Sequence, residues 1–245
     1  MTRSAAFPRA SMAIAVVGSF ALCAELVPAL AQDGRASDSA SAAAAAAASL
    51  AVTPLRIELP ASASAETVQV QNTTGSPMAV QMRLFAWSQQ NGEDVYAPSS
   101  DLLVSPSIVS IPAGQTQLVR VLRKGGATQG EKRFRLVIDQ LPDPAKARPG
   151  VAQTRVRFAI PVFVDRDKAA PAAFAWRITD GALELANIGG AAARIVQIEV
   201  KKPDGQIVPV EQNALRYVHG ASTIAWPIGK GCSLGKVRIP AHIDG

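Results

Sequence analysis

The stretch Thr154-Arg-Val-Arg-Phe-Ala-Ile-Pro-Val-Phe-Val164 alternates its side chains in the manner of a β-strand. Successive side chains of a strand point to opposite faces. One face is apolar from Val156 onward, whereas the other begins with Arg155 and Arg157 and turns apolar at Ala159. The first half of the strand is thus two-faced. The second half is apolar on both faces, as expected of a strand that runs into a core.

Pro161 interrupts the hydrogen bonding of this strand because proline has no N–H, and its position indicates an edge or a bulge. A long, half-apolar edge strand tends to pair with other chains unless something covers it. The stretch alone leaves two interpretations open. It is either an ordinary core strand with a local irregularity or a strand kept for another protein to pair with.

The chain before this strand consists of short apolar–polar alternations separated by turn residues. We expect strands at 50–59, 66–71, 78–87, 102–111, 116–122 and 133–141, and a loop at 89–94. Pro54 lies early in the first strand, which fits an edge strand or a strand that switches between sheets. Seven or so short strands at this spacing predict a β-sandwich over residues 50–166.

A second, smaller β-sandwich is expected over residues 167–245. Residues 166–173 are charged and then rich in alanine and proline, which is typical of a domain boundary. Further short strands are expected at 174–178, 182–187, 193–200, 207–210, 222–226 and 236–239. The predicted fold class is all-β, with two sandwich domains.

The N-terminus has the pattern of a secretory signal. Arg3 and Arg9 precede a mostly apolar run, and Ala29-Leu30-Ala31 is a small-x-small cleavage site, so residues 1–31 are expected to be removed. Residues 32–49 are rich in serine and alanine and are expected to form a low-complexity tether. Cleavage leaves Cys232 as the one cysteine of the mature chain, so no intrachain disulfide is expected.

Charge and hydropathy exclude several classes of function. Removal of the signal takes away two arginines and one glutamate and lowers the net charge from +6 to +5. The lysines and arginines are scattered, without a cluster interleaved with aromatic residues, which argues against nucleic-acid binding. No apolar run after the signal approaches the roughly 18 residues that a membrane-spanning helix needs.

The residue types of common active sites are sparse. The two histidines, His219 and His242, have no cysteine or carboxylate at metal-ligand spacing, so neither a metal site nor a cofactor is expected. Phosphate loops and nucleophile elbows are absent from the sequence. The acidic pairs Glu93/Asp94 and Asp139/Asp143 are expected to be ordinary solvated carboxylates. We therefore expect no enzymatic activity.

Several segments, taken in order, resemble the PapD-like periplasmic pilus chaperones, in particular the divergent branch related to spore-coat-U-type assembly systems. The segments are Leu50-x-Val-x-Pro-x-Arg56, Val68-Gln-Val-Gln-Asn72, Leu103-Val-Ser-Pro106, Ile111-Pro-Ala-Gly-Gln-Thr-Gln-Leu-Val-Arg-Val121, Glu131-Lys-Arg-Phe-Arg-Leu136, Arg157-Phe-Ala-Ile-Pro-Val-Phe-Val164 and Tyr217-Val-His-Gly-Ala-Ser-Thr-Ile-Ala-Trp-Pro227. The last departs from the family pattern, with His219 in place of leucine and no proline before Gly220.

The resemblance implies two immunoglobulin-like domains set at an angle, with a cleft between them. It implies a periplasmic protein that lends an edge strand to pilus or fimbrial subunits lacking a strand of their own. An outer-membrane usher would receive the complex. On this basis Val156, Phe158 and Ile160 are the expected donor side chains, with Thr154 as a weaker fourth position. Pairing of two copies, as a self-capping dimer, stays open.

The resemblance also implies a pair of cations that bind the terminal carboxylate of the subunit. Arg56 matches the family's arginine, but Pro161 stands where the family has a lysine. Arg155 or Arg157 are the expected substitutes. An alternative function, suggested by the fold alone, is that of an exported structural or adhesive β-sandwich protein of the cell surface.

Overall fold

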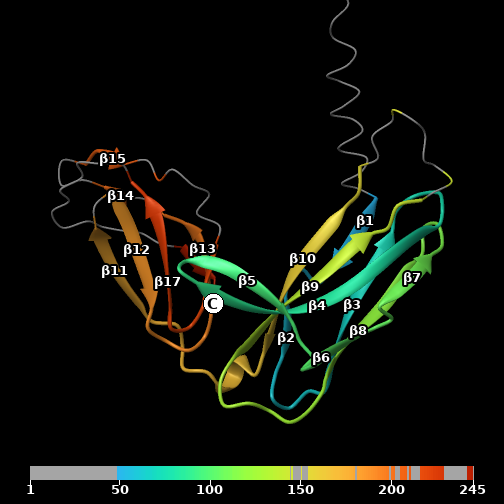
Figure 1. The fold of residues 1–245 in the computed structure, drawn as a ribbon, viewed down its shortest axis with the longest axis horizontal. Helices are drawn as coiled ribbons and strands as arrows, with labels where there is room; N and C mark the ends of the chain where they lie inside the picture. The colour runs from blue at the N-terminus through green and yellow to red at the C-terminus, as the bar shows by residue number, and fades with distance from the viewer. Residues whose placement is uncertain are drawn as a thin grey trace, which may run out of the picture.

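The structure is a computed structural model that describes residues 49–143, 145, 150, 154–179, 181–198, 200–201, 205–208, 210, 216–228 and 242–244. The expected signal peptide, all but Ser49 of the expected tether, and Cys232 lie outside the described residues. So does the strand expected at 236–239. The regular secondary structure of the described residues is β-strand apart from short 3-10 turns, and it forms two domains that enclose an angle (Figure 1).

The first domain is a sandwich of two sheets. One sheet has the order β1-β3-β8-β6, and its strands are Leu50–Thr53, Ala65–Asn72, Thr116–Arg123 and Leu102–Ser105. The other has the order β2-β10-β9-β4-β5, with strands Ile57–Leu59, Arg157–Val164, Lys132–Gln140, Met78–Gln90 and Glu93–Pro98; β7 (Ile108–Ile111) also pairs with β4. The predicted sandwich is thus confirmed.

Alternating apolar residues fill the space between these two sheets. On β9, Phe134, Leu136 and Ile138 are buried as their spacing predicts. On β4, Val80 and Met82 are buried, and Leu84 packs against the same core. The opposite face of the second sheet carries Trp87 and Phe163, which lie against Tyr217 of the second domain.

Two prolines mark the points at which the chain changes sheets. Pro54 lies between β1 and β2, which belong to different sheets, and Pro106 lies in the same way between β6 and β7. A strand that switches sheets was one of the two alternatives expected for Pro54, and the structure confirms it. Proline fits there because the switching residues have no ladder bond to donate to.

The expected loop at 89–94 is wrong. Gln89 and Gln90 continue β4, and Glu93 begins β5, so the two strands form a hairpin. The hairpin turns at Asn91 and Gly92, whose φ angles of 51° and 80° are both positive. Asn-Gly is the sequence that such a two-residue turn favours. The hairpin brings the end of β4 against the second domain (Figure 1).

The second domain is smaller and also built of sheets. β11 (Phe174–Thr179), β12 (Ala182–Asn187) and β17 (Ser222–Pro227) form one sheet, and β16 (Arg216–Val218), β13 (Ala193–Gln197) and β18 (His242–Asp244) form another. β14 (Val200–Lys201) pairs with β15 (Ile207–Val208). A separate core, which includes Leu183, Leu185 and Trp226, lies between them. The boundary expected near residue 166 stays a prediction; a short 3-10 turn, η2 (Arg166–Lys168), lies there.

Candidate functional site: the free edge of β10 and the cleft

One edge of strand β10 is fully paired with a neighbouring strand, and the other edge is paired only in part. β9 pairs with the whole of β10 in antiparallel register. On the other side, β2 pairs only with Val162 to Val164, and it runs parallel to β10. Within the described part of the chain, the edge from Arg157 to Pro161 therefore faces no strand.

The backbone groups that point toward this edge follow from the bonds of Val156. The Gln140 N–H donates to the carbonyl of Val156 at 3.0 Å, and the Val156 N–H donates to Gln140 Oε1 at 3.3 Å. Because successive residues alternate, the N–H and C=O groups of Arg157 and Ala159 face the free edge. The nitrogen of Pro161 also points to the free edge and away from β9. Its lack of an N–H therefore removes no hydrogen bond between β9 and β10. Of the two positions expected for Pro161, an edge or a bulge, the structure confirms the edge.

The inward face of the free half carries the expected donor side chains. Val156 and Phe158 are half-buried and pack against the margin of the first core. Ile160 is only 2% exposed and belongs to that core, whereas Thr154 is exposed. Of the four expected donor positions, Val156 and Phe158 are therefore the apolar ones that the chain itself leaves partly uncovered.

Arg56 lies at the end of the free edge. It immediately precedes β2, whose Ile57 pairs with Val162, so Arg56 stands beside Pro161. Its guanidinium lies 5.2 Å from the centre of the Phe163 ring and bonds Glu58. Its Nε is buried without a hydrogen-bond partner in the described part of the structure. Arg56 thus keeps donor capacity at the point where the free edge stops.

The two arginines expected to assist Arg56 lie elsewhere. Arg157 and Arg155 precede Pro161 by four and six residues, and a strand rises about 3.3 Å per residue. Arg157 bonds Asp139, which also accepts from Arg83 at 2.6 Å. Arg155 is exposed near the start of the free edge. Neither side chain is brought to Arg56.

Arg135 stands in the place that Arg155 and Arg157 were expected to fill. It is directly opposite Pro161 in the β9–β10 register. Its guanidinium lies 3.7 Å from the centre of the Trp87 ring, its side chain is 12% exposed, and Asp94 lies 3.9 Å away. Its Nε is buried without a partner among the described residues. Arg135 has no signal in the sequence that links it to Pro161, because only the pairing of β9 with β10 places the two residues side by side.

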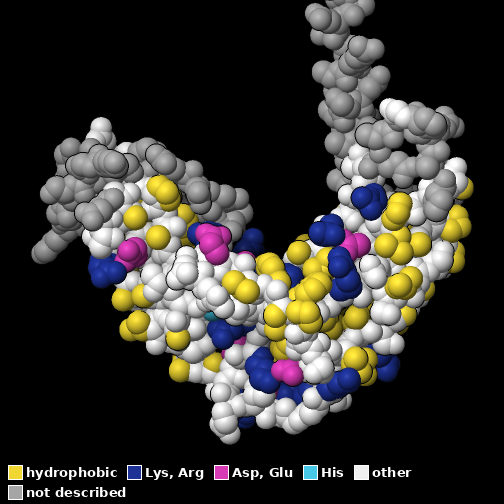
Figure 2. Space-filling view, in the orientation of Figure 1, with side chains coloured by type: hydrophobic (Ala, Val, Ile, Leu, Met, Phe, Trp, Pro, Cys, Tyr) yellow, Lys and Arg dark blue, Asp and Glu magenta, His cyan; other side chains and the backbone are white. Residues whose placement is uncertain are grey.

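A buried aromatic cluster joins the two domains. Trp87 and Phe163 of the first domain lie 6.3 Å apart, and Tyr217 of the second domain lies within 5.6 Å of both ring centres. The second half of β10 is apolar on both faces, which predicts that Phe163 is covered. The second domain provides that cover. Figure 2 shows the molecule hollowed above this joint.

Glu131 is a buried carboxylate that bonds both domains. Its Oε1 accepts from the backbone N–H of Ala192 at 2.9 Å, and its Oε2 accepts from Arg166 Nη1 at 2.7 Å. Burial raises the pKa of Glu131, and the bond from Ala192 and the nearby charge of Arg166 oppose that rise. The carboxylate fixes the second domain relative to β9 and η2.

Gln89 makes a second link between the domains. Its Nε2 donates to the carbonyl of Tyr217 at 2.8 Å, and its Oε1 accepts from the backbone N–H of His219 at 2.9 Å. The imidazole of His219 lies edge-on against Trp87, with the ring centres 4.2 Å apart. Burial, with a smaller effect of the positive charge of Arg133, lowers the pKa of His219 to about 3. His219 is therefore neutral at the joint.

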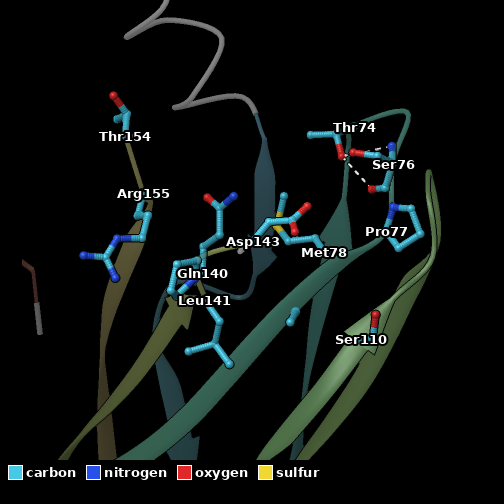
Figure 3. Close-up of a pocket in the computed structure, with 12 residues that line it drawn as sticks. Thr74, Ser76, Pro77, Met78, Ser110, Gln140, Leu141, Asp143, Thr154 and Arg155 are labelled. Carbon is cyan, nitrogen blue, oxygen red and sulfur yellow. Dashed lines mark hydrogen bonds between the residues drawn. The ribbon is translucent and has the colours of Figure 1, made fainter. Parts of the chain in front are cut away.

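A recess of about 470 Å³ lies at the other end of the free edge, beside the root of β10 (Figure 3). It lies between the end of β9 and the turn before β4, and Gln140, Leu141 and Met78 are among the residues that line it. Figure 3 shows the guanidinium of Arg155 turned away from Leu141. Thr154 and Arg155 also line the recess, which therefore borders the start of the free edge.

The described residues contain no group of three or more histidine, cysteine, aspartate or glutamate side chains that could hold a metal ion. No helix in the described part of the chain is long and apolar enough to cross a membrane. Of the four carboxylates expected to be solvated, Glu93, Asp94 and Asp143 are exposed. The expectation is wrong for Asp139, which is 8% exposed and accepts hydrogen bonds from two arginines.

The sequence of the first domain identifies its family. Residues 49–169 match the family model described as "Pili and flagellar-assembly chaperone, PapD N-terminal domain". The chain belongs to the PapD-like pilus-assembly chaperones, as the sequence resemblance implied. A search of curated protein sequences finds no match.

Solved structures of pilus chaperones share the fold. A chain of the CsuC–CsuE chaperone–tip adhesion subunit pre-assembly complex from archaic chaperone-usher Csu pili of Acinetobacter baumannii is 22% identical; the match covers 80% of this chain and 96% of that one, with a TM-score of 0.61. The E. coli chaperone DraB is 19% identical; the match covers 79% of this chain and 95% of that one, with a TM-score of 0.58. A chain of the Salmonella enterica SafA pilin in complex with the SafB chaperone is 18% identical; the match covers 74% of this chain and 84% of that one, with a TM-score of 0.56. At these identities the likeness concerns the fold, and it confirms the two immunoglobulin-like domains.

Proposed function

We propose that this protein is a periplasmic chaperone that binds incomplete pilus or fimbrial subunits by donor-strand complementation. The observation that carries the proposal is the free edge of β10 from Arg157 to Pro161, with half-buried apolar side chains on one face. A subunit that lacks one strand would pair with this edge and take Val156 and Phe158 into its open groove. No nucleotide or other cofactor is needed, because the binding itself completes the fold of the subunit.

The apolar contacts account for a useful part of the affinity. Full burial of an aliphatic or aromatic side chain is worth about 1.5–3 kcal/mol. Val156 and Phe158 are already half-buried against their own core, so each contributes less than that range. Ladder hydrogen bonds from Arg157 and Ala159 add a modest net energy and fix the register of the bound strand.

The start of β2 suggests where a bound subunit strand would end. β2 runs parallel to β10 and begins at Ile57 opposite Val162. A subunit strand that fills the free part of the edge in the same direction ends directly in front of β2. Its terminal carboxylate then lies beside Arg56 and Pro161.

Arg135 is the proposed second cation for that carboxylate. It lies on the far side of Pro161 from Arg56, and both side chains have a buried Nε without a partner among the described residues. Buried donors without partners are rare and call for an explanation. Guanidinium groups bind carboxylates in a bidentate manner, so a bound carboxylate accounts for both. We propose Arg135 in preference to Arg155 and Arg157, which lie nearer the start of the edge.

The proposal includes two further partners, an outer-membrane usher and a second copy of the protein. The loaded chaperone would pass its subunit to an outer-membrane usher. Before a subunit binds, the free edges of two copies can pair and form a self-capping dimer. The alternative, an exported structural or adhesive protein of the cell surface, has no comparable feature of the described residues in its favour.

The first test is purification of the tagged mature protein from a periplasmic extract, with mass spectrometry of whatever co-purifies. A stoichiometric small subunit that aggregates once separated supports the chaperone function. Recovery of the protein alone, or in surface polymers, contradicts it and favours the structural alternative.

Phe158→Asp should abolish subunit binding while the sandwich stays folded, because a charge cannot enter the apolar groove of the subunit. Leu118→Asp is the matched control, since Leu118 is 56% exposed on the outer face of the other sheet. Circular dichroism and a urea titration check folding. Unfolding of the Phe158 variant alone would mean that this part of β10 is internal.

Arg135→Gln should weaken subunit binding about 10- to 100-fold, the effect of losing a hydrogen bond to a charged group. Arg120→Gln is the control, because Arg120 is exposed on the other sheet and has no bonded partner in the described structure. Equal affinities of the two variants, measured by titration calorimetry with the recovered subunit, would remove Arg135 from the site.

A further inference from the structure

Three arginines gather on the cleft-facing side of the free half of β10. Arg155 and Arg157 alternate with the apolar donor residues, and Arg83 of β4 lies close to Arg157 through their shared partner Asp139. Figure 2 shows lysine and arginine side chains concentrated on the wall of the first domain that faces the hollow. We call Arg83, Arg155 and Arg157, with Asp139, the basic wall.

Asp139 keeps two of these cations side by side. It accepts from Arg83 Nη2 at 2.6 Å and from Arg157 Nε. Burial by itself would raise the pKa of Asp139, but the hydrogen bonds from Arg157 and Arg83 outweigh it and leave the pKa below its usual value. The carboxylate is thus ionised at neutral pH, and the basic wall carries two net positive charges.

The cations of the wall keep free donors toward the solvent. The side chain of Arg157 is 65% exposed, and only its Nε is used by Asp139. Arg155 is exposed and has no ion pair with another described residue. Arg157 begins β10 and Arg155 precedes it by two residues, so both lie on the face opposite Val156 and Phe158.

We propose that the basic wall selects subunits whose terminal strand is acidic on one face and apolar on the other. This inference rests on the proposed function. A strand paired with the free edge places its side chains about 5 Å from those of Arg155 and Arg157 on the same face. Opposite charges across such a pair are favourable and like charges are unfavourable. The partner is therefore a strand that alternates apolar residues with aspartate or glutamate.

The preference is expected to be measurable and sensitive to salt. One cross-strand charge pair changes affinity by up to about five-fold. Two positions that attract one strand and repel another sum four such contributions, so the two affinities should differ by at least about four-fold. Exposed charges are screened by ions over about 10 Å at 0.1 M salt, so the difference should shrink as salt is added.

The test uses two synthetic peptides of about ten residues, the length of a long strand. One alternates valine with glutamate, the other valine with lysine, and both end in a free carboxylate. We expect the mature protein to bind the glutamate peptide at least about four-fold more tightly at low salt. The reversal Arg155→Glu should reduce this preference, and Arg155→Glu with Arg157→Glu should invert it. Arg120→Glu and Arg177→Glu, which make the same charge change elsewhere, should leave it unchanged.

Arg155→Glu keeps the test valid if the double variant fails to fold, since Arg155 has no bonded partner among the described residues. Equal affinities for the two peptides, no binding of either, or an equal effect of the Arg120 variant would overturn the inference. Recovery of a subunit from the periplasm decides the proposed function separately. If the protein co-purifies with a subunit but shows no preference between the two peptides, the proposed function stands and the selection by the basic wall is refuted.

Discussion

Replacing His219 with leucine should make the stability of the protein less dependent on pH. The imidazole is 1% exposed, and its Nε2 has no hydrogen-bond partner in the described structure. Burial is the main reason that its pKa falls to about 3. Leucine is of similar size and has no charged form, and the backbone N–H of residue 219 can still donate to Gln89.

The direction follows from which state binds the proton first. A histidine in the unfolded chain has a pKa of about 6.5, whereas folded His219 stays neutral down to about pH 3. Between these values only the unfolded state takes up the proton, so the folded state loses stability as the pH falls. Each pH unit below 6.5 lowers the free energy of unfolding by about 1.4 kcal/mol. From about pH 7.5 to about pH 5 the loss is about 2 kcal/mol.

Urea titrations measure the free energy of unfolding of the wild type and of His219→Leu at several pH values. Tryptophan fluorescence is a suitable signal because Trp87 lies against His219. Contributions from the carboxylates cancel in the difference between the two proteins. The wild type should lose about 2 kcal/mol relative to the variant over that pH interval. Parallel curves would refute the argument, as would an NMR titration in which the His219 imidazole becomes protonated near pH 6.

Two further changes test the links between the domains. Glu131→Gln should lower the free energy of unfolding by about 2–4 kcal/mol, because Arg166 is left without its buried ionic partner; a change below about 0.5 kcal/mol in a urea titration would mean that the carboxylate is not needed at the joint. Gln89→Ala should cost about 1–3 kcal/mol for its two hydrogen bonds to the second domain. Gln69→Ala on the exposed face of β3 should change stability by less than about 0.5 kcal/mol, and equal effects of the two variants would contradict the role of Gln89.

The parts of the fold that could be predicted from sequence are those fixed by local patterns. Phe134, Leu136 and Ile138 alternate over a single strand, so their common inward face follows from strand geometry alone. Pro54 marks a switch between sheets because proline cannot join a ladder. The hairpin at Asn91-Gly92 also had a local signal, yet its polar residues resemble those of a loop.

The candidate site could be predicted only in part, because it depends on which strands become neighbours. Alternation places Ile160 on the same face as Val156 and Phe158, but it does not tell where the protein's own core ends. That limit is set by the two sheets, which bury Ile160 and leave the other two partly uncovered. Arg135 is 26 residues from Pro161 in the sequence, and only the antiparallel register of β9 with β10 brings them opposite each other.

Pro161 connects these observations. It stands between the part of β10 that pairs with β2 and the part that faces no described strand. Because its nitrogen points toward β2 and carries no hydrogen, β2 cannot extend along β10 without losing a ladder bond at this point. A subunit strand that ends there needs no such donor, since its last group is a carboxylate and Arg56 and Arg135 flank the proline. On the proposed function, a proline at the position where the resemblance implies a lysine is thus compatible with carboxylate binding, and this proline also limits how far the protein can cover its own edge.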